Sequence, residues 1–182
     1  MSAWLPLGAV GLLAVAARVV RRGSPALASW YHGTSGEDAA RILRAGIDVE
    51  RERRSDPGDF GWGVYLAHDP ERARSYGPVV LEFLVEEAGL ARIPNPYFVA
   101  GLDEVAPVTE AERRFHALAF APGGRMRTVQ GRWAERVAAS REIRDAFLAA
   151  GYAGIRSDYL GGETVIFDPS IVRRIRVFAE PA

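Results

Sequence analysis

The chain has 182 residues, of which 48% are hydrophobic and 10% aromatic, and this is enough to bury one hydrophobic core. Its 23 basic residues, all of them arginine, balance its 23 acidic residues, so the composition does not indicate a strongly electropositive surface built for nucleic acid. The absence of cysteine excludes disulfides, thiol nucleophiles and thiolate metal ligands, and three scattered histidines argue against a zinc site. We therefore expect one globular domain and no metal.

The beginning of the chain differs in composition from the rest. Residues 3–17 carry no charge, and three arginines follow before a Gly-Ser-Pro break. A membrane-spanning helix needs roughly 20 apolar residues, so this run spans a bilayer only if the next valines are counted and Arg18 reaches the interface. The charges come after the apolar run, which is not the order of a cleaved secretory signal.

We therefore expect residues 1–24 to be an apolar helix, distinct from a domain at residues 25–182. One interpretation is a membrane anchor through residues 3–20, which holds the domain on the cytoplasmic face of the membrane. The other is a helix that packs on the domain or on a partner chain of a cytoplasmic protein.

The domain begins with a predicted strand, helix and loop. Residues 29–32, SWYH, are typical of the end of a strand, and residues 35–47 predict a short helix with Ile42 and Leu43 facing inward. Residues 48–61 are charged and contain a DPGDFG turn, so we expect an exposed loop.

A strand, a capped helix and a second strand come next. The sequence WGVYLA at residues 62–67 predicts a strand, after which Asp69 is a helix cap and Pro70 fits the first helical position. This helix is expected to run for two turns and stop near Gly77, before a strand at residues 79–87.

The middle of the chain, residues 94–131, has less pattern, with a capping box at Thr109 and Glu112 and a glycine turn at residues 121–125. Residues 133–150 then predict a helix whose inward positions are apolar. These positions are Trp133, Val137, Ile143 and Phe147.

The C-terminal part predicts more sheet. Residues 153–157 and 163–168 have strand character, and residues 171–178 alternate in polarity, with arginines on the outer face. The whole pattern indicates a mixed domain of the α+β class.

Tyr65 lies in a predicted strand, and Tyr76 lies at the end of the short helix after it. Two aromatic faces across a slot hold a flat, electron-poor ring well, because stacking and cation–π attraction both favour a positively charged heteroaromatic. Nicotinamide in NAD is such a ring. Taken alone, two such tyrosines are better explained by packing, but the chain also places His32 and Glu163 at the ends of predicted strands.

The order of these motifs resembles a known family. His32 is followed by glycine, Tyr65 lies in a G-x-G-V-Y strand, Tyr76 comes after a short helix, and Glu163 opens a late apolar strand. In these features residues 30–178 resemble the ADP-ribosyltransferases of the diphtheria-toxin and poly-ADP-ribose polymerase type, whose His, Tyr, Glu triad comes from three separate strands. The resemblance implies an α+β fold with a split mixed β-sheet and short helices, to which the apolar N-terminal helix is added.

The resemblance also implies roles for particular residues. The catalytic residues would be Glu163, Tyr65 and His32, and the NAD-binding residues would be His32, Gly33, Thr34, Tyr65 and Tyr76. Glu163 would accept a hydrogen bond from a ribose 2′-hydroxyl and stabilise the positive charge that grows as the bond to nicotinamide stretches. His32 would donate to a ribose hydroxyl of the adenosine half, and the backbone of Gly33 would pair with the nicotinamide amide.

The chain departs from the family pattern at two positions. Ala73 stands where polymerase relatives have a serine that binds nicotinamide, and Gly161 stands where arginine-modifying families carry an acid or amide. We therefore expect that arginine side chains are not the acceptor of ADP-ribose. The loop at residues 156–162 is the candidate element for recognition of the acceptor. Several arginines are possible pyrophosphate partners but are better explained as surface residues: Arg53, Arg54 and Arg156.

The sequence thus predicts an enzyme that uses NAD as substrate and transfers a single ADP-ribose unit to an unidentified acceptor, protein or nucleic acid, with release of nicotinamide. Two alternatives stay open. One is a catalytically silent binding or virion-type structural protein on the same fold. The other is an NAD-dependent RNA 2′-phosphotransferase, which also has a histidine-glycine strand motif but relies on arginines.

Overall fold

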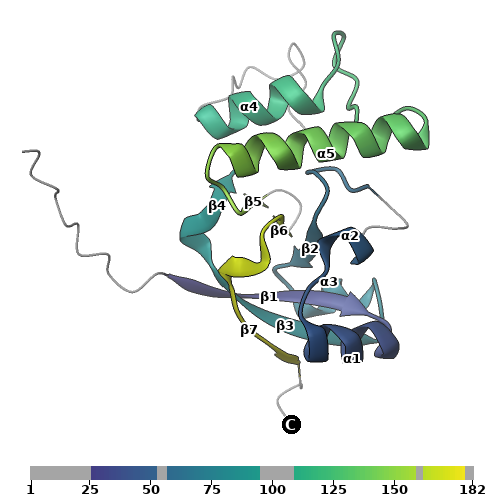
Figure 1. Cartoon of the computed structure of the whole chain (residues 1–182), viewed down its shortest axis with the longest axis vertical. Helices are drawn as coiled ribbons and strands as arrows, with labels where there is room; N and C mark the ends of the chain where they lie inside the picture. The colour runs from purple at the N-terminus through teal and green to yellow at the C-terminus, as the bar shows by residue number, and fades with distance from the viewer. Residues whose placement is uncertain (1–25, 53–56, 95–108, 159–161, 179–182) are drawn as a thin grey trace, which may run out of the picture.

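The computed structural model describes residues 26–52, 57–94, 109–158 and 162–178. These residues form an α+β domain with five α-helices and a curled seven-stranded sheet (Figure 1). The strands are β1 (Leu27–Thr34), β2 (Val64–Ala67), β3 (Val79–Glu86), β4 (Leu90–Arg92), β5 (Gly154–Ser157), β6 (Glu163–Ile166) and β7 (Val172–Val177). The helices are α1 (Gly36–Ala45), α2 (Val49–Glu52), α3 (Pro70–Arg74), α4 (Glu110–Ala119) and α5 (Trp133–Ala149).

The sheet is mixed, as the resemblance implies. Its strand order is β4-β5-β6-β2-β1-β3-β7, in which β4 and β5 are parallel and the other neighbours are antiparallel. The apolar segment at residues 1–24, expected to be a helix, lies outside the described residues. Within the described ranges, no helix combines the length and apolar character needed to cross a membrane.

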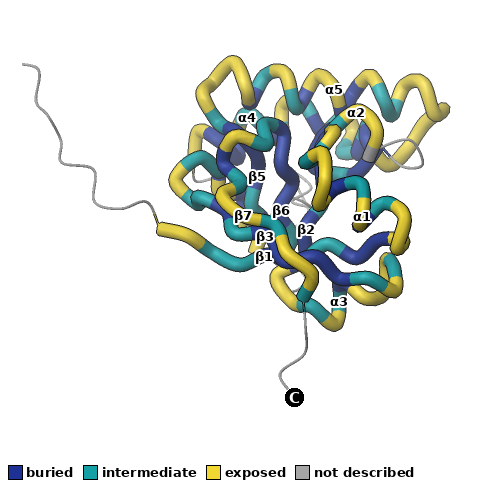
Figure 2. Tube along the Cα trace, turned by 60° about the horizontal axis from the view of Figure 1, so that its bottom comes forward, coloured by how far each residue is buried: buried dark blue, intermediate teal, exposed yellow. Residues whose placement is uncertain are grey.

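The two larger hydrophobic cores lie on opposite faces of the sheet, because successive side chains of a strand point to opposite sides. In β6, Val165 packs into the core under α4 and α5, whereas Ile166 packs into the core under α1. Buried residues follow the strands and the inner faces of these helices (Figure 2). The strand sequences are therefore apolar on both faces in the centre of the sheet.

Helix α1 begins where the sequence predicts. The hydroxyl of Ser35 accepts a hydrogen bond from the backbone N–H of Asp38 and so caps the first turn. Ile42 is buried as expected, but the expectation for Leu43 is wrong, because its side chain is 44% exposed. Ala39 and Ile42, three positions apart, face the sheet, and the residue after Ile42 is turned away by the helical rotation of about 100°.

Helices α4 and α5 pack against each other and cover the β4–β5 end of the sheet (Figure 1). The predicted capping box is present, since Thr109 and Glu112 each bind the other's backbone N–H. Trp133 is 46% exposed, so the prediction that it faces inward is wrong. It lies at the first position of α5, before the part of the helix, around Ile143 and Phe147, that reaches the core.

The prediction of an exposed loop at residues 48–61 is wrong in both parts of this segment that the structure describes. Its start forms the short helix α2, and its end, from Pro57 to Gly61, is largely buried. Phe60 packs into the core beside Phe115, and the hydroxyl of Ser140 on α5 donates to the carbonyl of Gly58. The backbone here has partners inside the protein, which allows it to be buried.

The middle of the sheet contains a split between β1 and β2. Strand β1 pairs with β3 along its whole length, from Leu27 to Thr34, but its register with β2 consists of the pair Tyr31 and Ala67. Beyond that pair the two strands diverge. Residues on the separated ends of β1 and β2 therefore face a common space.

Candidate functional site

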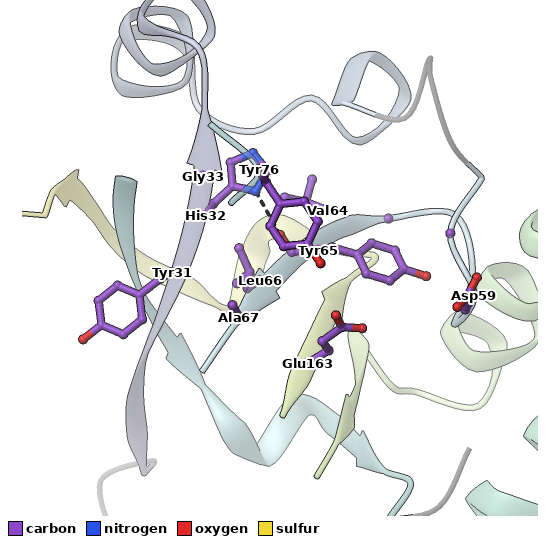
Figure 3. A pocket seen from close by; sticks show the side chains of 12 residues that line it. Tyr31, His32, Gly33, Asp59, Val64, Tyr65, Leu66, Ala67, Tyr76 and Glu163 are labelled. Carbon is purple, nitrogen blue, oxygen red and sulfur yellow. Dashed lines mark hydrogen bonds between the residues drawn. The ribbon is translucent and has the colours of Figure 1, made fainter. Parts of the chain in front are cut away.

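A cavity of about 250 Å³ lies at the split between β1 and β2 (Figure 3). It is lined by residues from β1, β2, the start of β6, and the segments that precede β2 and follow α3. Among its lining residues are five of the residues expected from the sequence, namely His32, Gly33, Tyr65, Tyr76 and Glu163. The fold brings these residues together from positions up to 131 apart, the difference between 163 and 32.

His32 bridges the split. Its Nδ1 lies 2.9 Å from the backbone carbonyl oxygen of Tyr65, and its ring packs edge-on against Phe83, with ring centroids 6.0 Å apart. A carbonyl oxygen can only accept, so Nδ1 carries the proton in this contact. In the neutral ring Nε2 is then an acceptor, which differs from the donor role expected for His32.

Tyr65 uses its hydroxyl within the protein. The hydroxyl accepts a 2.6 Å hydrogen bond from the backbone N–H of Phe60 and donates to the carbonyl of Gly61 at 3.2 Å. The Phe60 ring lies nearly parallel to the Tyr65 ring, at 17° and a centroid distance of 6.1 Å. Tyr65 therefore fixes the buried segment before β2 while it lines the cavity.

Helix α3 is held against the end of β1 by the absence of a side chain at two glycines. A Cβ placed on Gly33 would lie 1.7 Å from the carbonyl oxygen of Ala73, and one on Gly77 would lie 2.5 Å from the backbone of Thr34. The structure thus gives Gly33 a packing role, in addition to its place on the cavity wall. This close contact places Tyr76 at the rim of the cavity, where the residue is 64% exposed.

The helix itself starts as predicted and is shorter than predicted. Asp69 accepts a hydrogen bond from the backbone N–H of Glu71, and Pro70 occupies the first position, but the helix ends at Arg74. Ser75 donates its hydroxyl hydrogen to the carbonyl of Arg72, which closes the last turn.

Glu163 opens β6, as predicted, and pairs across the sheet with Ala67 on one side and Ser157 on the other. Its carboxylate is bound by Arg72 of α3, with 2.5 Å between Nη2 and Oε1. The side chains are 21% exposed for Glu163 and 31% exposed for Arg72. Burial opposes the charge of Arg72, but Glu163 and the hydroxyl of Tyr76 outweigh it and raise the arginine's pKa.

Thr34 and Arg156 are not among the residues that line the cavity. Thr34 is 8% exposed, lies under Gly77 and does not line the cavity. Arg156 forms ion pairs with Glu87 and Asp158. Arg53 and Arg54 lie outside the described residues, as do residues 159–161 of the loop expected to read the acceptor.

Two residues of the site are not apparent from the sequence. Arg72 is one of many arginines, and nothing in its spacing marks it as the partner of Glu163. Asp59 lines the cavity from the segment before β2, where its backbone carbonyl accepts a hydrogen bond from the hydroxyl of Thr128 at 3.0 Å. Its place depends on contacts with residues far along the chain.

Comparison with known proteins gives little beyond the structure. No protein-family model and no curated protein matches this chain. A structure described as the crystal structure of an anti-CRISPR protein is similar to it over 86% of this chain and 100% of that chain, with 16% sequence identity and a TM-score of 0.42. A likeness at this level carries no argument about function.

Proposed function

We propose that this protein transfers a single ADP-ribose unit from NAD to an acceptor macromolecule and releases nicotinamide, on a fold of the ADP-ribosyltransferase type. The observation that carries the proposal is the meeting of a histidine, two tyrosines and a glutamate from separate parts of the chain on one cavity. These residues are His32, Tyr65, Tyr76 and Glu163.

The size of the cavity fits one end of the substrate. At about 250 Å³ it is smaller than the roughly 300–1,000 Å³ usual for a site that encloses a whole drug-sized ligand. A cavity of this volume suits the nicotinamide ring of NAD and the ribose attached to it, with the adenosine half of NAD near the opening. The rings of Tyr65 and Tyr76 supply aromatic surface for the cationic nicotinamide.

The reaction needs charge stabilisation more than acid catalysis. The bond between ribose C1′ and the nicotinamide nitrogen breaks, and its electron pair leaves with nicotinamide. Glu163, as a carboxylate, accepts a hydrogen bond from the ribose 2′-hydroxyl and stabilises the positive charge that grows on C1′. A nucleophilic atom of the acceptor then bonds to C1′ and loses its proton, which Glu163 helps to remove.

His32 and Gly33 position the substrate in this scheme. Because His32 donates from Nδ1 to the carbonyl of Tyr65, its Nε2 accepts a hydrogen bond from a ribose hydroxyl when the ring is neutral. The backbone of Gly33 pairs with the amide group of nicotinamide.

The experiment that tests the proposal is incubation of the purified full-length chain with NAD, followed by measurement of free nicotinamide. We expect time-dependent release in proportion to protein concentration. Binding of NAD without release would favour the silent binding protein, and removal of a 2′-phosphate from RNA in the presence of NAD would favour the phosphotransferase.

A further inference from the structure

Arg72 contacts the residue that we propose as catalytic. Its guanidinium lies 2.5 Å from the Glu163 carboxylate, and both side chains are largely shielded from water. Arg72 also interacts with the hydroxyl of Tyr76, so that Glu163, Arg72 and Tyr76 form a small network of side chains. Arg72 is thus a permanent cation next to the cavity, although it is not among the residues that line it.

In this arrangement Glu163 is poorly suited to its proposed role. A carboxylate stabilises positive charge on the ribose because it is negative, and a guanidinium in direct contact with it offsets much of that charge. The ion pair also occupies a carboxylate oxygen that the ribose hydroxyl needs. Glu163 therefore stabilises positive charge on the ribose fully when Arg72 moves away and binds another group.

The proposed substrate carries such a partner. NAD has a diphosphate between its two riboses, and the described lining of the cavity contains the acids Asp59 and Glu163 but no arginine. The planar fork of arginine binds phosphate oxygens as well as it binds a carboxylate. Since the contact at Gly33 holds α3 in place, the side chain of Arg72 can move without the helix.

We propose that Arg72 is a substrate-dependent switch, which holds Glu163 in the resting protein and moves to the diphosphate when the dinucleotide binds. The carboxylate is then exposed to the ribose. This inference rests on the proposed function and extends it to substrate choice: a nicotinamide riboside without phosphate leaves the ion pair closed.

The first test uses inorganic pyrophosphate and the full-length chain, with dissociation constants measured by calorimetry. Glu163→Gln removes the competing carboxylate, so it should tighten pyrophosphate binding by about tenfold, and Arg72→Gln should weaken it by about tenfold or more. Arg74→Gln is the matched control, because Arg74 lies on the same helix with its side chain 38% exposed and faces Glu71 at 3.8 Å. It should change binding by less than about threefold.

The second test compares NAD with nicotinamide riboside. Arg72→Gln should weaken NAD binding and strengthen binding of the riboside, each by about tenfold, because the variant lacks both the phosphate contact and the closed ion pair. A variant that merely damages the site would weaken both ligands. Loss of affinity for both, or no change in either, would overturn the switch.

The Arg72 switch and the proposed transfer reaction can each be refuted without the other. Pyrophosphate binding that is unchanged in both Arg72→Gln and Glu163→Gln overturns the switch, even if the wild-type protein releases nicotinamide from NAD. Opposite changes in the two variants support the switch, even if no nicotinamide is released, and in that case the proposed transfer reaction is wrong.

Discussion

At the scale of single residues, Tyr65 combines two roles that the sequence shows only in part. Its ring faces the cavity, as the resemblance implies, but its hydroxyl also ties down the buried segment before β2 through Phe60 and Gly61. The hydroxyl role depends on the path of that segment, whose charged neighbours suggest exposure. A local sequence pattern does not contain this information.

The two roles of Tyr65 can be separated by substitution. Tyr65→Ala should weaken NAD binding more than Tyr65→Phe, because the face of the ring holds nicotinamide. Tyr65→Phe should still lower the free energy of unfolding by about 1–3 kcal/mol, since it leaves the N–H of Phe60 without its acceptor. Calorimetric titration and denaturant unfolding measure the two effects, and equal losses of NAD affinity in both variants would contradict the stacking role.

Gly33 gives a second prediction at this scale. The Cβ of Gly33→Ala would overlap the backbone carbonyl of Ala73, which no rotamer change can relieve, so α3 must shift. We expect a loss of about 1–3 kcal/mol in unfolding free energy together with weaker NAD binding, because Arg72 and Tyr76 move with the helix.

Gly36→Ala is the control for this substitution. A Cβ at Gly36, in the first turn of α1, meets nothing within 4 Å, and alanine is the better helix former. Thermal unfolding should show it to be neutral or stabilising. Equal stability of Gly33→Ala and the wild type would show that the close contact between β1 and α3 is not required.

At the scale of elements, the sequence predicts features that neighbouring residues determine, such as helix caps. It does not predict features that depend on contacts with distant parts of the chain. The helix caps at Asp69 and Thr109 are predicted correctly because a cap lies next to the turn that it serves. The direction of Leu43 and Trp133 depends on where the sheet lies, so both are placed wrongly. The pairing of Arg72 with Glu163 needs α3 and β6 to be placed together.

Strand β3 also carries a buried carboxylate, from which we expect the stability of the fold to depend on pH. Glu82 on β3 is 7% exposed and accepts hydrogen bonds from Arg176 of β7, at 2.5 Å, and Ser29 of β1, at 2.6 Å. The hydrogen bond from Arg176, followed by that from Ser29, holds the pKa of Glu82 below its usual value. The folded state therefore binds this proton less readily than the unfolded state does.

The sign of the pH effect follows from this difference. The contribution of Glu82 to stability is complete above its unfolded pKa, about 4.3, and is lost as the pH falls toward the lower pKa of the folded state. Glu82→Gln should therefore reduce stability at pH 7 and flatten its decline between about pH 5 and pH 3. Urea unfolding across this range measures the slope, and a slope as steep as that of the wild type would contradict the assignment.

At the scale of the whole molecule, the pattern of elements predicts the α+β class, whereas the mixed sheet and its split are implied by the resemblance alone. The order of strands in the sheet depends on pairings such as those of β2 with β6, which join residues about one hundred positions apart. The motif order around His32, Tyr65 and Glu163 still predicts their meeting, because it comes from a resemblance and not from local pattern.

The apolar run at residues 3–20 leads to a prediction about the whole chain. If it is an anchor, the full-length protein should partition with membranes, and a chain that begins at Ser24 should be soluble and keep its NAD chemistry, because an anchor contributes no contacts to the core. Membrane fractionation and a melting curve of the shortened chain measure this. Aggregation of the shortened chain, with full-length protein in the soluble fraction, would favour a packed helix instead.

The most direct test of the central claim is to measure NAD binding and nicotinamide release together in Glu163→Gln. We expect NAD to bind about as well as it does to the wild type, or better, while the rate of release falls by at least about a hundredfold, because the neutral amide cannot stabilise charge on the ribose. Glu110→Gln, at an exposed position on α4, should change neither quantity. Release by Glu163→Gln at the wild-type rate would contradict the claim that this cavity is the site of the reaction.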